Sequence, residues 1–342
     1  MSINIDYDRI LGLISNVSSK VNTLCIGDVM LDKFVYGLVE RISPEAPVPV
    51  FSLKSEKIML GGAGNVAINL STLGCNVSFL GVAGRDENAK VLSRLFRDSG
   101  VKHYFVKIPN YPTIVKTRIL ANNQHLLRID KEEKFKIPYT IIGRLSSILK
   151  KIISKQDIVL LSDYNKGVFS VESCQMVIDL ANELGKKTIV DPKGTDYSKY
   201  RNAYLVKPNL KEFKEATGLT SVDPKSENFL NEIKLGAEVL YQKFNIQNLI
   251  VTLSEHGMVY VSPKSEKIFH IPTVAKEVFD VSGAGDTSLA TLGMSLANNF
   301  SISDAMVLAN IASGIVVGKL GTSSVTLDEI CLHIKMNKNQ FS

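Results

Sequence analysis

The chain alternates short apolar runs with longer stretches of helical periodicity, and this alternation restricts its fold more than any other feature. The apolar runs are rich in β-forming residues and are closed by Gly, Asp, Ser or Asn: TLCIG, VSFLGVAG, DIVLLSD, KTIVDPK, AYLVKPN and NLIVTLS. Helical patterns over 63–73, 87–98, 138–154 and 171–184 lie between several of them. This order indicates an α/β fold with a doubly wound, mostly parallel sheet flanked by helices.

Polar residues follow several of these predicted strands directly. They are Asp28, Asp163, Asp191, Asn209 and Ser254. In open parallel sheets, ligands bind in the crevice beyond the carboxyl ends of the strands. We therefore expect these five side chains to converge on one crevice.

Two stretches interrupt the alternation. Residues 33–54 and 104–130 have strand and turn patterns without a helix, and they predict a small β-sheet lid over the crevice. The sequence has no repeat and no linker long enough to separate a second domain, so residues 1–342 are expected to form one domain. The segment 333–342 is expected to be a frayed end.

Composition excludes several classes of protein. The net charge of +6 is small for 342 residues and the lysines are scattered, so a nucleic-acid partner is not expected. The four cysteines lack metal-ligand spacing and are expected to be reduced thiols. The first residues lack the basic start of a signal peptide, and no apolar run reaches the length of a membrane span. The expected location is the cytoplasm.

A first glycine cluster, LGGAGNVAINLSTLG, spans residues 60–74, and residues 62–67 formally match the dinucleotide pattern G-x-G-x-x-A. The preceding SLKSEKIM is a poor candidate for a buried strand, which disfavours a nicotinamide-binding oxidoreductase. Two interpretations remain open. The glycines pack a helix start closely onto a sheet, or Gly62 lets a sugar approach the backbone while Asn65 binds a hydroxyl.

The segment CIGDVMLD ends an early strand with two carboxylates, Asp28 and Asp32. Such an aspartate is ordinarily a turn or cap residue. Alternatively, its two oxygens accept hydrogen bonds from vicinal hydroxyls of a sugar. Asp28 is the preferred candidate because it lies nearer the strand end.

Two further segments have both a structural and a functional interpretation. In KPNLKEF, Asn209 and Glu212 fit a capping box, or they orient phosphate oxygens and the water shell of Mg²⁺. In VTLSEHG, the hydroxyl residues and Gly257 fit a hairpin, or they let a nucleotide approach the strand end.

The segment DVSGAGD is the strongest local signal. Gly283 and Gly285 precede a helix predicted over 289–297, and a glycine-rich helix start favours bound anions such as a triphosphate. Asp286 then either caps the helix or accepts the proton of an attacking hydroxyl.

Together, GGAGNVAINLSTLG, KPNLKE, VTLSEHG and DVSGAGD resemble the ribokinase-like PfkB family of sugar kinases over essentially the whole chain. The resemblance implies an ATP-dependent phosphotransferase with a β-sheet lid. It implies Asp286 as general base, with Gly283 and Gly285 as the anion hole. It also implies that Asn209 and Glu212 serve Mg²⁺ and phosphate, and that Thr252, Ser254 and Gly257 line the nucleotide site. Asp28, Gly62 and Asn65 would face the sugar. Asp280 and Ser282 match the place where some members bind a monovalent cation such as K⁺.

A narrower resemblance concerns the acceptor. GDVMLDKFVYGLVERISPEAPVPVF, LLSDYNKGV and VDPKG look like the heptose-7-phosphate kinases of lipopolysaccharide core synthesis. Many of these are fused to a nucleotidyltransferase whose H-x-G-H motif is missing here, so a free-standing kinase is expected, followed by a separate adenylyltransferase. Departures from the pattern are Lys33-Phe34, where an Arg-aromatic pair is usual, and Ser282, where threonine is common.

A phosphorylated sugar needs a cation away from Asp286. Charge alone offers Lys193, Arg118, Arg128 and Lys166, each also suited to a solvated surface. The alternatives are the same fold acting on ribose, fructose or 2-keto-3-deoxygluconate, and a non-catalytic sugar-binding regulator. Exposed lid edges predict pairing of subunits into a homodimer.

Overall fold

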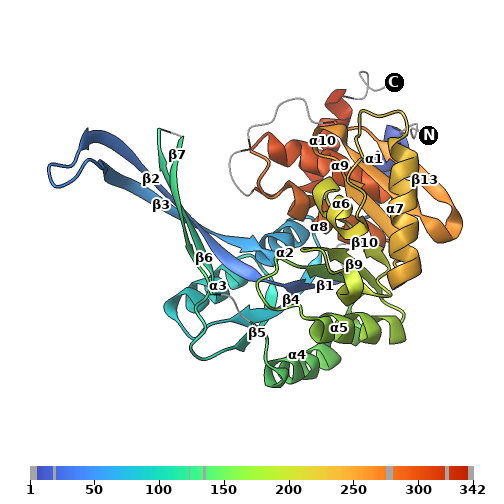
Figure 1. Cartoon of the computed structure of the whole chain (residues 1–342), viewed down its shortest axis with the longest axis horizontal. Coiled ribbons are helices and arrows are strands. Elements are labelled where there is room, and N and C mark those ends of the chain that lie inside the picture. The colour runs from blue at the N-terminus through green and yellow to red at the C-terminus, as the bar shows by residue number, and fades with distance from the viewer. Residues whose placement is uncertain are drawn as a thin grey trace.

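The computed structural model of the chain describes residues 6–17, 21–122, 124–133, 136–274, 280–319 and 323–337. It consists of a helix-covered body and an arm-like sheet that projects from the body (Figure 1). The strands of the body are β1 (Asn22–Gly27), β4 (Asn76–Ala83), β5 (Lys102–Lys107), β8 (Ile158–Ser162), β9 (Lys187–Asp191), β10 (Leu205–Val206), β11 (Asn248–Thr252), β12 (Met258–Ser262) and β13 (Lys267–Ile271).

These strands form one nine-stranded sheet in the order β13-β12-β11-β10-β9-β8-β1-β4-β5. All pairs from β11 to β5 are parallel, and only the β11–β12 and β12–β13 pairs are antiparallel. The mostly parallel sheet is therefore confirmed, as are the six predicted strands. The antiparallel edge arises because β11 and β12 form the hairpin that VTLSEHG also allowed.

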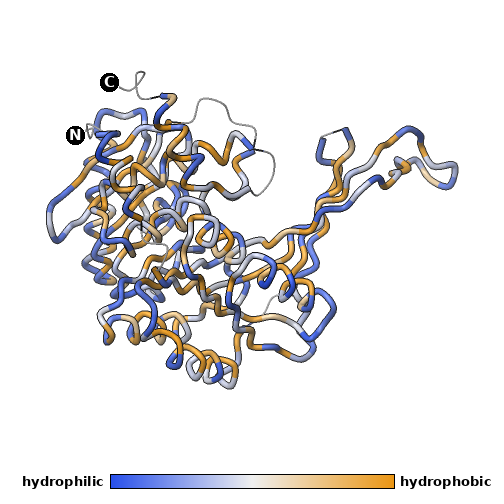
Figure 2. Tube along the Cα trace, turned by 180° about the vertical axis from the view of Figure 1, so that it is seen from behind, coloured by the Kyte–Doolittle hydropathy of each residue, from blue (hydrophilic) through white to orange (hydrophobic). Residues whose placement is uncertain are grey.

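Helices cover both faces of this sheet. One face carries α1 (Tyr7–Ser15), α2 (Ala63–Thr72), α3 (Glu87–Asp98), α8 (Ala284–Ala297), α9 (Ile302–Val317) and α10 (Leu327–Asn337). The other carries α4 (Tyr139–Ile152), α5 (Val171–Glu183), α6 (Leu210–Thr217) and α7 (Phe229–Phe244). Short 3-10 turns are η1 (Ile153–Lys155), η2 (Tyr197–Tyr200), η3 (Ser254–His256) and η4 (Pro263–Ser265). Each face has its own hydrophobic cluster. Figure 2 shows hydrophobic stretches throughout the body and along the arm.

The projecting sheet is the predicted lid. Its four strands are β2 (Val29–Ile42), β3 (Pro49–Gly62), β6 (Val115–Ala121) and β7 (Gln124–Lys131), in the order β3-β2-β6-β7. Its bounds differ from those expected. Residues 104–107 belong to β5 of the main sheet because they continue its parallel ladder beside β4. The first lid segment extends to Gly62 because the whole of β3 pairs with β2.

The strand β3 also corrects one argument made from the sequence. SLKSEKIM is a strand, and it leads directly into Gly62 and α2. Its residues were judged unsuitable because they are mostly polar, and they are indeed largely exposed. They belong to the antiparallel lid rather than to a buried parallel sheet. None of the helices among the described residues is long and apolar enough to cross a membrane.

Candidate active site

The helix α8 begins earlier than its apolar pattern predicted. Gly283 is its N-cap residue, in a left-handed conformation with φ of 86°, and no side chain caps the helix. The backbone N–H of Thr287 donates to the carbonyl of Gly283 over 2.9 Å. Asp286 is consequently a residue of the first helical turn and not the cap. The capping interpretation of Asp286 is wrong, because glycine takes the left-handed position that ends the preceding turn.

The carboxylate of Asp286 is buried, with 5% of the residue exposed, and it is bonded on both oxygens. Asn65 Nδ2 donates to Oδ2 over 2.8 Å, and the Tyr164 hydroxyl donates to Oδ1 over 2.7 Å. Burial raises the pKa of Asp286 to about 7, against the lowering effect of these two donors. A carboxyl that titrates near neutral pH is well suited to accept a proton from a hydroxyl group.

Asn65 comes from the first turns of α2, and further hydrogen bonds tie this helix to α8. Asn69 Nδ2 donates to the Asn65 carbonyl over 2.9 Å. The Thr287 hydroxyl in turn donates to Asn69 Oδ1 over 3.0 Å. The glycine cluster and the DVSGAGD segment, far apart in sequence, therefore meet through buried polar side chains.

One residue near the turn before α8, Lys207, was given no role from the sequence, and it pairs with Asp191, one of the polar residues expected in the crevice. Lys207 Nζ lies 3.0 Å from Asp191 Oδ1, and the lysine is buried. A Cβ built on Gly285 would lie 3.9 Å from Lys207 Nζ and 4.0 Å from Asp191 Oδ2. This places a cation beside the glycines of the predicted anion hole. The sequence signal was weak, since Lys207 was visible only as the first residue of KPN.

The two aspartates of CIGDVMLD have different surroundings. Asp28 accepts hydrogen bonds from the backbone N–H groups of Tyr164, Lys166 and Val168 at 2.9–3.0 Å. Burial, followed by the nearby Asp163, raises the pKa of Asp28 to about 6. This geometry favours a structural role for Asp28, whose oxygens hold the loop after β8, over the expected role in binding sugar hydroxyls.

Asp32 lies in β2 at the root of the lid and is buried. Its Oδ1 pairs with Arg118 of β6, whose guanidinium also lies 5.2 Å from the centre of the Phe34 ring. A Cβ on Gly61 would lie 2.2 Å from Asp32 Oδ2, so the glycine lets this carboxylate sit against the backbone of β3. Asp32 is thus a second candidate for the acceptor side.

The four basic candidates for a substrate phosphate differ in their partners. Lys193 binds Glu212 over 2.7 Å, on the nucleotide side of the predicted crevice, and Lys166 binds Glu132 over 2.7 Å. Arg128 contacts only Asp130 among the ion pairs of the described residues and is 57% exposed at its side chain. It lies directly opposite Arg118 in the β6–β7 ladder. The two arginines of the lid are therefore adjacent, and like the lysines each is paired with a carboxylate, Arg118 with Asp32 and Arg128 with Asp130.

On the predicted nucleotide side, Asn209 and Glu212 form the capping box of α6. Glu212 N–H donates to Asn209 Oδ1 over 2.9 Å, and Asn209 N–H donates to Glu212 Oε2 over 3.1 Å. The structural interpretation of this segment is confirmed. Both oxygens of Glu212 are bonded, one to Asn209 and one to Lys193. Direct coordination of a metal by Glu212 is accordingly disfavoured.

Thr252 forms an isolated parallel bridge with Asn209, which brings the ends of β10 and β11 together. Ser254 and Gly257 both have positive φ, 54° and 83°, in the turn between β11 and β12. A Cβ on Gly257 would lie 2.0 Å from the carbonyl of Ile271, so only glycine fits there.

The remaining predicted site residues are Gly62 and the candidates for a monovalent cation, Asp280 and Ser282. Gly62 has φ of 59°, and a Cβ on it would lie 2.6 Å from the Asp28 carbonyl. Asp280 Oδ1 accepts the N–H of Ser282 over 2.8 Å in a tight turn before Gly283. Within the described part of the chain, no three His, Cys, Asp or Glu residues are grouped as a metal site.

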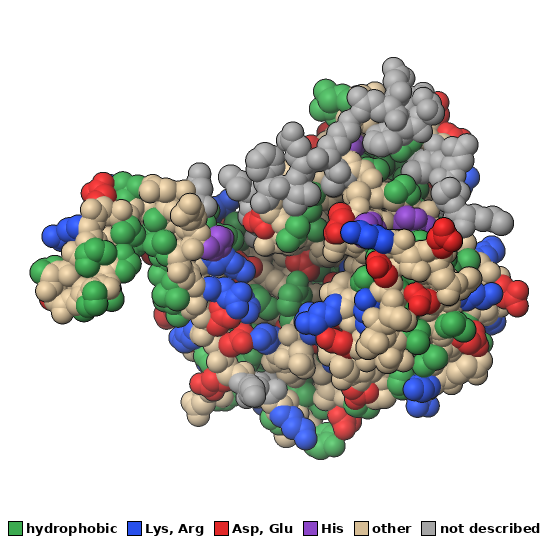
Figure 3. Space-filling model, turned by 45° about the horizontal axis from the view of Figure 1, so that its top comes forward, with side chains coloured by type: hydrophobic (Ala, Val, Ile, Leu, Met, Phe, Trp, Pro, Cys, Tyr) green, Lys and Arg blue, Asp and Glu red, His purple; other side chains and the backbone are tan. Residues whose placement is uncertain are grey.

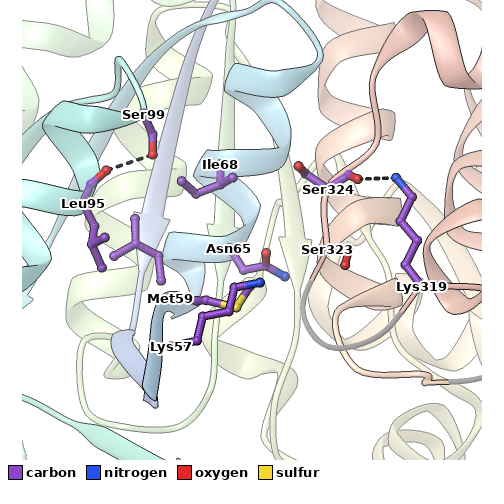
Figure 4. Close-up of a pocket in the computed structure, with 10 residues that line it drawn as sticks. Lys57, Met59, Asn65, Ile68, Leu95, Ser99, Lys319, Ser323 and Ser324 are labelled. Carbon is purple, nitrogen blue, oxygen red and sulfur yellow. Dashed lines mark hydrogen bonds between the residues drawn. The ribbon is translucent and has the colours of Figure 1, made fainter. Parts of the chain in front are cut away.

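The space-filling view shows a hollow between the lid and the body, with acidic side chains in its depth and Lys and Arg side chains around its rim (Figure 3). Asn65 also lines a separate cavity of about 440 Å³ (Figure 4). Lys57 and Met59 of β3 line one part of this cavity, and Lys319 lies across from them. Asp286, Gly285 and Lys207 are not among its lining residues, whereas Asn65, which binds Asp286, is.

A buried carboxylate thus lies at a glycine-rich helix start beside a buried lysine, an arrangement suited to phosphoryl transfer. The sequence family described as pfkB family carbohydrate kinase matches residues 21–329. The chain belongs to this family of carbohydrate kinases. This excludes the oxidoreductase and regulator alternatives.

Several relatives share much of the sequence. The bifunctional protein HldE of Nitratiruptor sp. is 44% identical over 311 residues, which cover 91% of this chain and 64% of that protein. HldE of Vibrio cholerae is 43% identical over 323 residues, covering 94% and 65%. The chain therefore spans slightly less than two thirds of the length of these relatives.

Solved structures confirm the ribokinase-like fold. Phosphofructokinase-2 from Escherichia coli in complex with potassium superposes with a TM-score of 0.73 at 19% identity, covering 93% of this chain and 99% of that chain. Ribokinase of Arabidopsis thaliana complexed with ribose and ATP gives a TM-score of 0.69 at 20% identity, covering 92% and 98%.

Proposed function

We propose that the chain transfers the γ-phosphate of ATP to the anomeric hydroxyl of D-glycero-D-manno-heptose 7-phosphate and forms the 1,7-bisphosphate for ADP-heptose and lipopolysaccharide core synthesis. The identity of more than 40% with HldE proteins supports a heptose phosphate as acceptor. The single observation that carries the proposed chemistry is the buried Asp286 carboxylate, whose pKa is raised to about 7 beside the start of α8.

In this proposal Asp286 is the general base. It accepts the proton of the anomeric hydroxyl as the oxygen attacks the γ-phosphorus and the bond to ADP breaks. Its pKa lets it be ionised at neutral pH and still hold a proton well enough to take one. The protein otherwise acts by positioning and by charge stabilisation, because phosphoryl transfer needs little covalent work from it.

On the donor side, Gly283 and Gly285 at the positive end of α8 form the anion hole for the transferring phosphate. Lys207 adds a buried positive charge next to Gly285. Thr252, Ser254 and Gly257 line the nucleotide site. Mg²⁺ bound to ATP neutralises phosphate charge, and Asn209 and Glu212 orient its water shell indirectly, since the bonded oxygens of Glu212 do not fit direct coordination.

A monovalent cation is proposed near Asp280 and Ser282, whose turn leads into Gly283. The related phosphofructokinase-2 of Escherichia coli was solved in complex with potassium. Potassium at this turn would stabilise the residues that precede the anion hole.

On the acceptor side, Gly62 and Asn65 face the sugar and Asp32 binds its hydroxyl groups. The phosphate of the acceptor is bound by Arg118 and Arg128 of the lid. Arg118 and Arg128 lie directly opposite each other on neighbouring strands, so one phosphate can contact both guanidinium groups. Lys193 is a weaker candidate than expected because Glu212 binds it.

Two subunits are proposed to pair through their lids. The edge strand β7 is exposed along its whole length, and Leu127 and Ile129 within it are about half exposed. Strand edges and apolar side chains of this kind favour association.

The test of the function is a panel of free and phosphorylated sugars with ATP and Mg²⁺, scored by ADP release. Heptose 7-phosphate is expected to give the highest kcat/KM, and Asp286→Asn is expected to abolish turnover of it. Preference for ribose, fructose or 2-keto-3-deoxygluconate would overturn the acceptor. Undiminished turnover by Asp286→Asn would overturn the base.

A further inference from the structure

Tyr164 contacts the proposed base directly, although no role was expected for it. It follows β8, and its hydroxyl donates to Asp286 Oδ1 over 2.7 Å while Asn65 binds the other oxygen. We propose that Tyr164 is a positioning residue for Asp286, which fixes the orientation of the carboxylate and stabilises its charged form. This inference rests on the proposed function, in which Asp286 is the base.

The loop that carries Tyr164 is held in one conformation by buried carboxylates. Asp28 accepts three of its backbone N–H groups, including that of Tyr164. Asp163 accepts the N–H of Asn165 over 2.7 Å and also binds Tyr200. Asn165 and Gly167 have positive φ, 55° and 107°, which curls the backbone around Asp28. The hydroxyl of Tyr164 is therefore presented to Asp286 by a rigid support.

The ring of Tyr164 has a second contact at the same place. A Cβ on Gly62 would lie 3.6 Å from Tyr164 Cδ2, so the ring packs next to the glycine at the root of the lid. The ring thus packs beside Gly62 while its hydroxyl reaches Asp286. A phenylalanine would keep this packing and remove only the hydroxyl, which separates the two contributions.

Several charged or titratable groups face Asp286, and each has a defined effect on it. Burial raises its pKa most, Asn65 and Tyr164 lower it by donating hydrogen bonds, Asp191 raises it and Lys207 lowers it. Cys25 of β1 lies near as well, but burial raises the pKa of its thiol so far that the thiol stays neutral. Loss of the Tyr164 hydroxyl removes a stabilising donor, so the pKa of Asp286 must move upward.

The first test is the pH profile of kcat for Tyr164→Phe with heptose 7-phosphate or the best acceptor found. A hydrogen bond to a charged group corresponds to a shift of about one pH unit. We expect the acidic limb to move upward by about one unit, with about tenfold lower kcat at pH 6 and near-normal kcat at pH 9. KM for ATP should stay within about twofold.

The matched control is Tyr260→Phe, which also removes a buried tyrosine hydrogen bond, here to Asn248 over 2.7 Å, without contact to Asp286. Its acidic limb should stay in place. An unmoved limb in Tyr164→Phe, or an equal loss of kcat at every pH, would overturn the proposal, because a merely structural contact lowers activity without changing the titration.

A second measurement does not depend on catalysis. Urea midpoints of wild type and Tyr164→Phe are compared at pH 5 and pH 9, and again in the Asp286→Asn background. The difference in urea midpoint between wild type and Tyr164→Phe should be larger at pH 9 than at pH 5 only when Asp286 is present, because only the charged form of Asp286 needs the Tyr164 hydroxyl. A midpoint difference that is the same at pH 5 and pH 9 would overturn the role of Tyr164, even if the protein phosphorylates no sugar tested. A larger difference at pH 9 together with absent turnover would overturn only the proposed function.

Discussion

Replacing Asp286 by asparagine should stabilise the folded protein at alkaline pH while it abolishes catalysis. The folded carboxyl has a pKa raised to about 7 by burial, whereas its ordinary value is 3.8. Between these two values the folded state holds a proton that the unfolded chain has released. The free energy of unfolding of the wild type therefore falls as pH rises through this window, and the loss is complete above about pH 7. The neutral asparagine has no such dependence.

The size of the effect follows from the free energy of about 1.36 kcal/mol per pKa unit. From pH 5 to pH 9 the wild type crosses about two units of this window, so it should lose about 2.7 kcal/mol relative to Asp286→Asn. Asparagine can keep both contacts, because its amide oxygen accepts from Asn65 and its NH₂ group donates to the Tyr164 hydroxyl.

Urea unfolding at pH 5 and pH 9, monitored by circular dichroism, measures this difference. The midpoint of the variant relative to wild type should rise by roughly 1 M between the two pH values. Asp28, whose pKa is also raised, is present in both proteins and cancels from the comparison. A difference that stays constant between pH 5 and pH 9 would refute the reasoning, because it would mean that Asp286 ionises in the folded state as it does in the unfolded chain.

Three other outcomes are expected. Gly257→Ala should lower stability in thermal unfolding by about 2 kcal/mol or more, because its Cβ would lie 2.0 Å from the Ile271 carbonyl at a φ of 83°. The control Gly143→Ala in α4, whose Cβ would have no atom within 4 Å, should instead raise stability by about 0.5–1 kcal/mol. Lys207→Met should lower kcat by about a hundredfold in steady-state assays, because a buried cation beside Gly285 is lost, and an unchanged kcat would remove it from the anion hole. Arg128→Met should raise KM for a phosphorylated acceptor by about tenfold and leave KM for ATP unchanged, and an equal rise in both would contradict a role in acceptor binding.

The sequence predicts the body of this fold well because its signals are local. The four expected helices are present, and α3 covers the expected residues from Glu87 to Asp98. The start of α8 was missed because the apolar pattern begins after the glycines, although the helix geometry begins at Ala284. The lid strand β3 was undervalued since polar residues suit an exposed antiparallel strand as well as a loop.

In the candidate site, too, the sequence predicts the residues that lie in one local segment and misses those that meet only in the fold. The proposed base and the glycine turn lie within one segment, so a local motif was sufficient to select them. Tyr164 and Lys207 contact Asp286 and Asp191, which belong to other segments of the chain, and no motif relates such pairs. Asp28 was preferred to Asp32 because it is nearer the strand end. The two aspartates differ in that the backbone N–H groups of Tyr164, Lys166 and Val168 donate to Asp28, and these contacts are visible only in the structure.

The direct passage from the lid strand β3 into α2 at Gly62 sets a limit on how this protein can change length. A helix turns by about 100° per residue, so one residue inserted between Gly62 and Asn65 would carry the amide of Asn65 away from Asp286. Residues 43–48, at the far tip of the same hairpin, join β2 to β3 without any such constraint. The arm can therefore be lengthened or shortened at its tip, while its root must keep the same residue count for the proposed base to stay aligned.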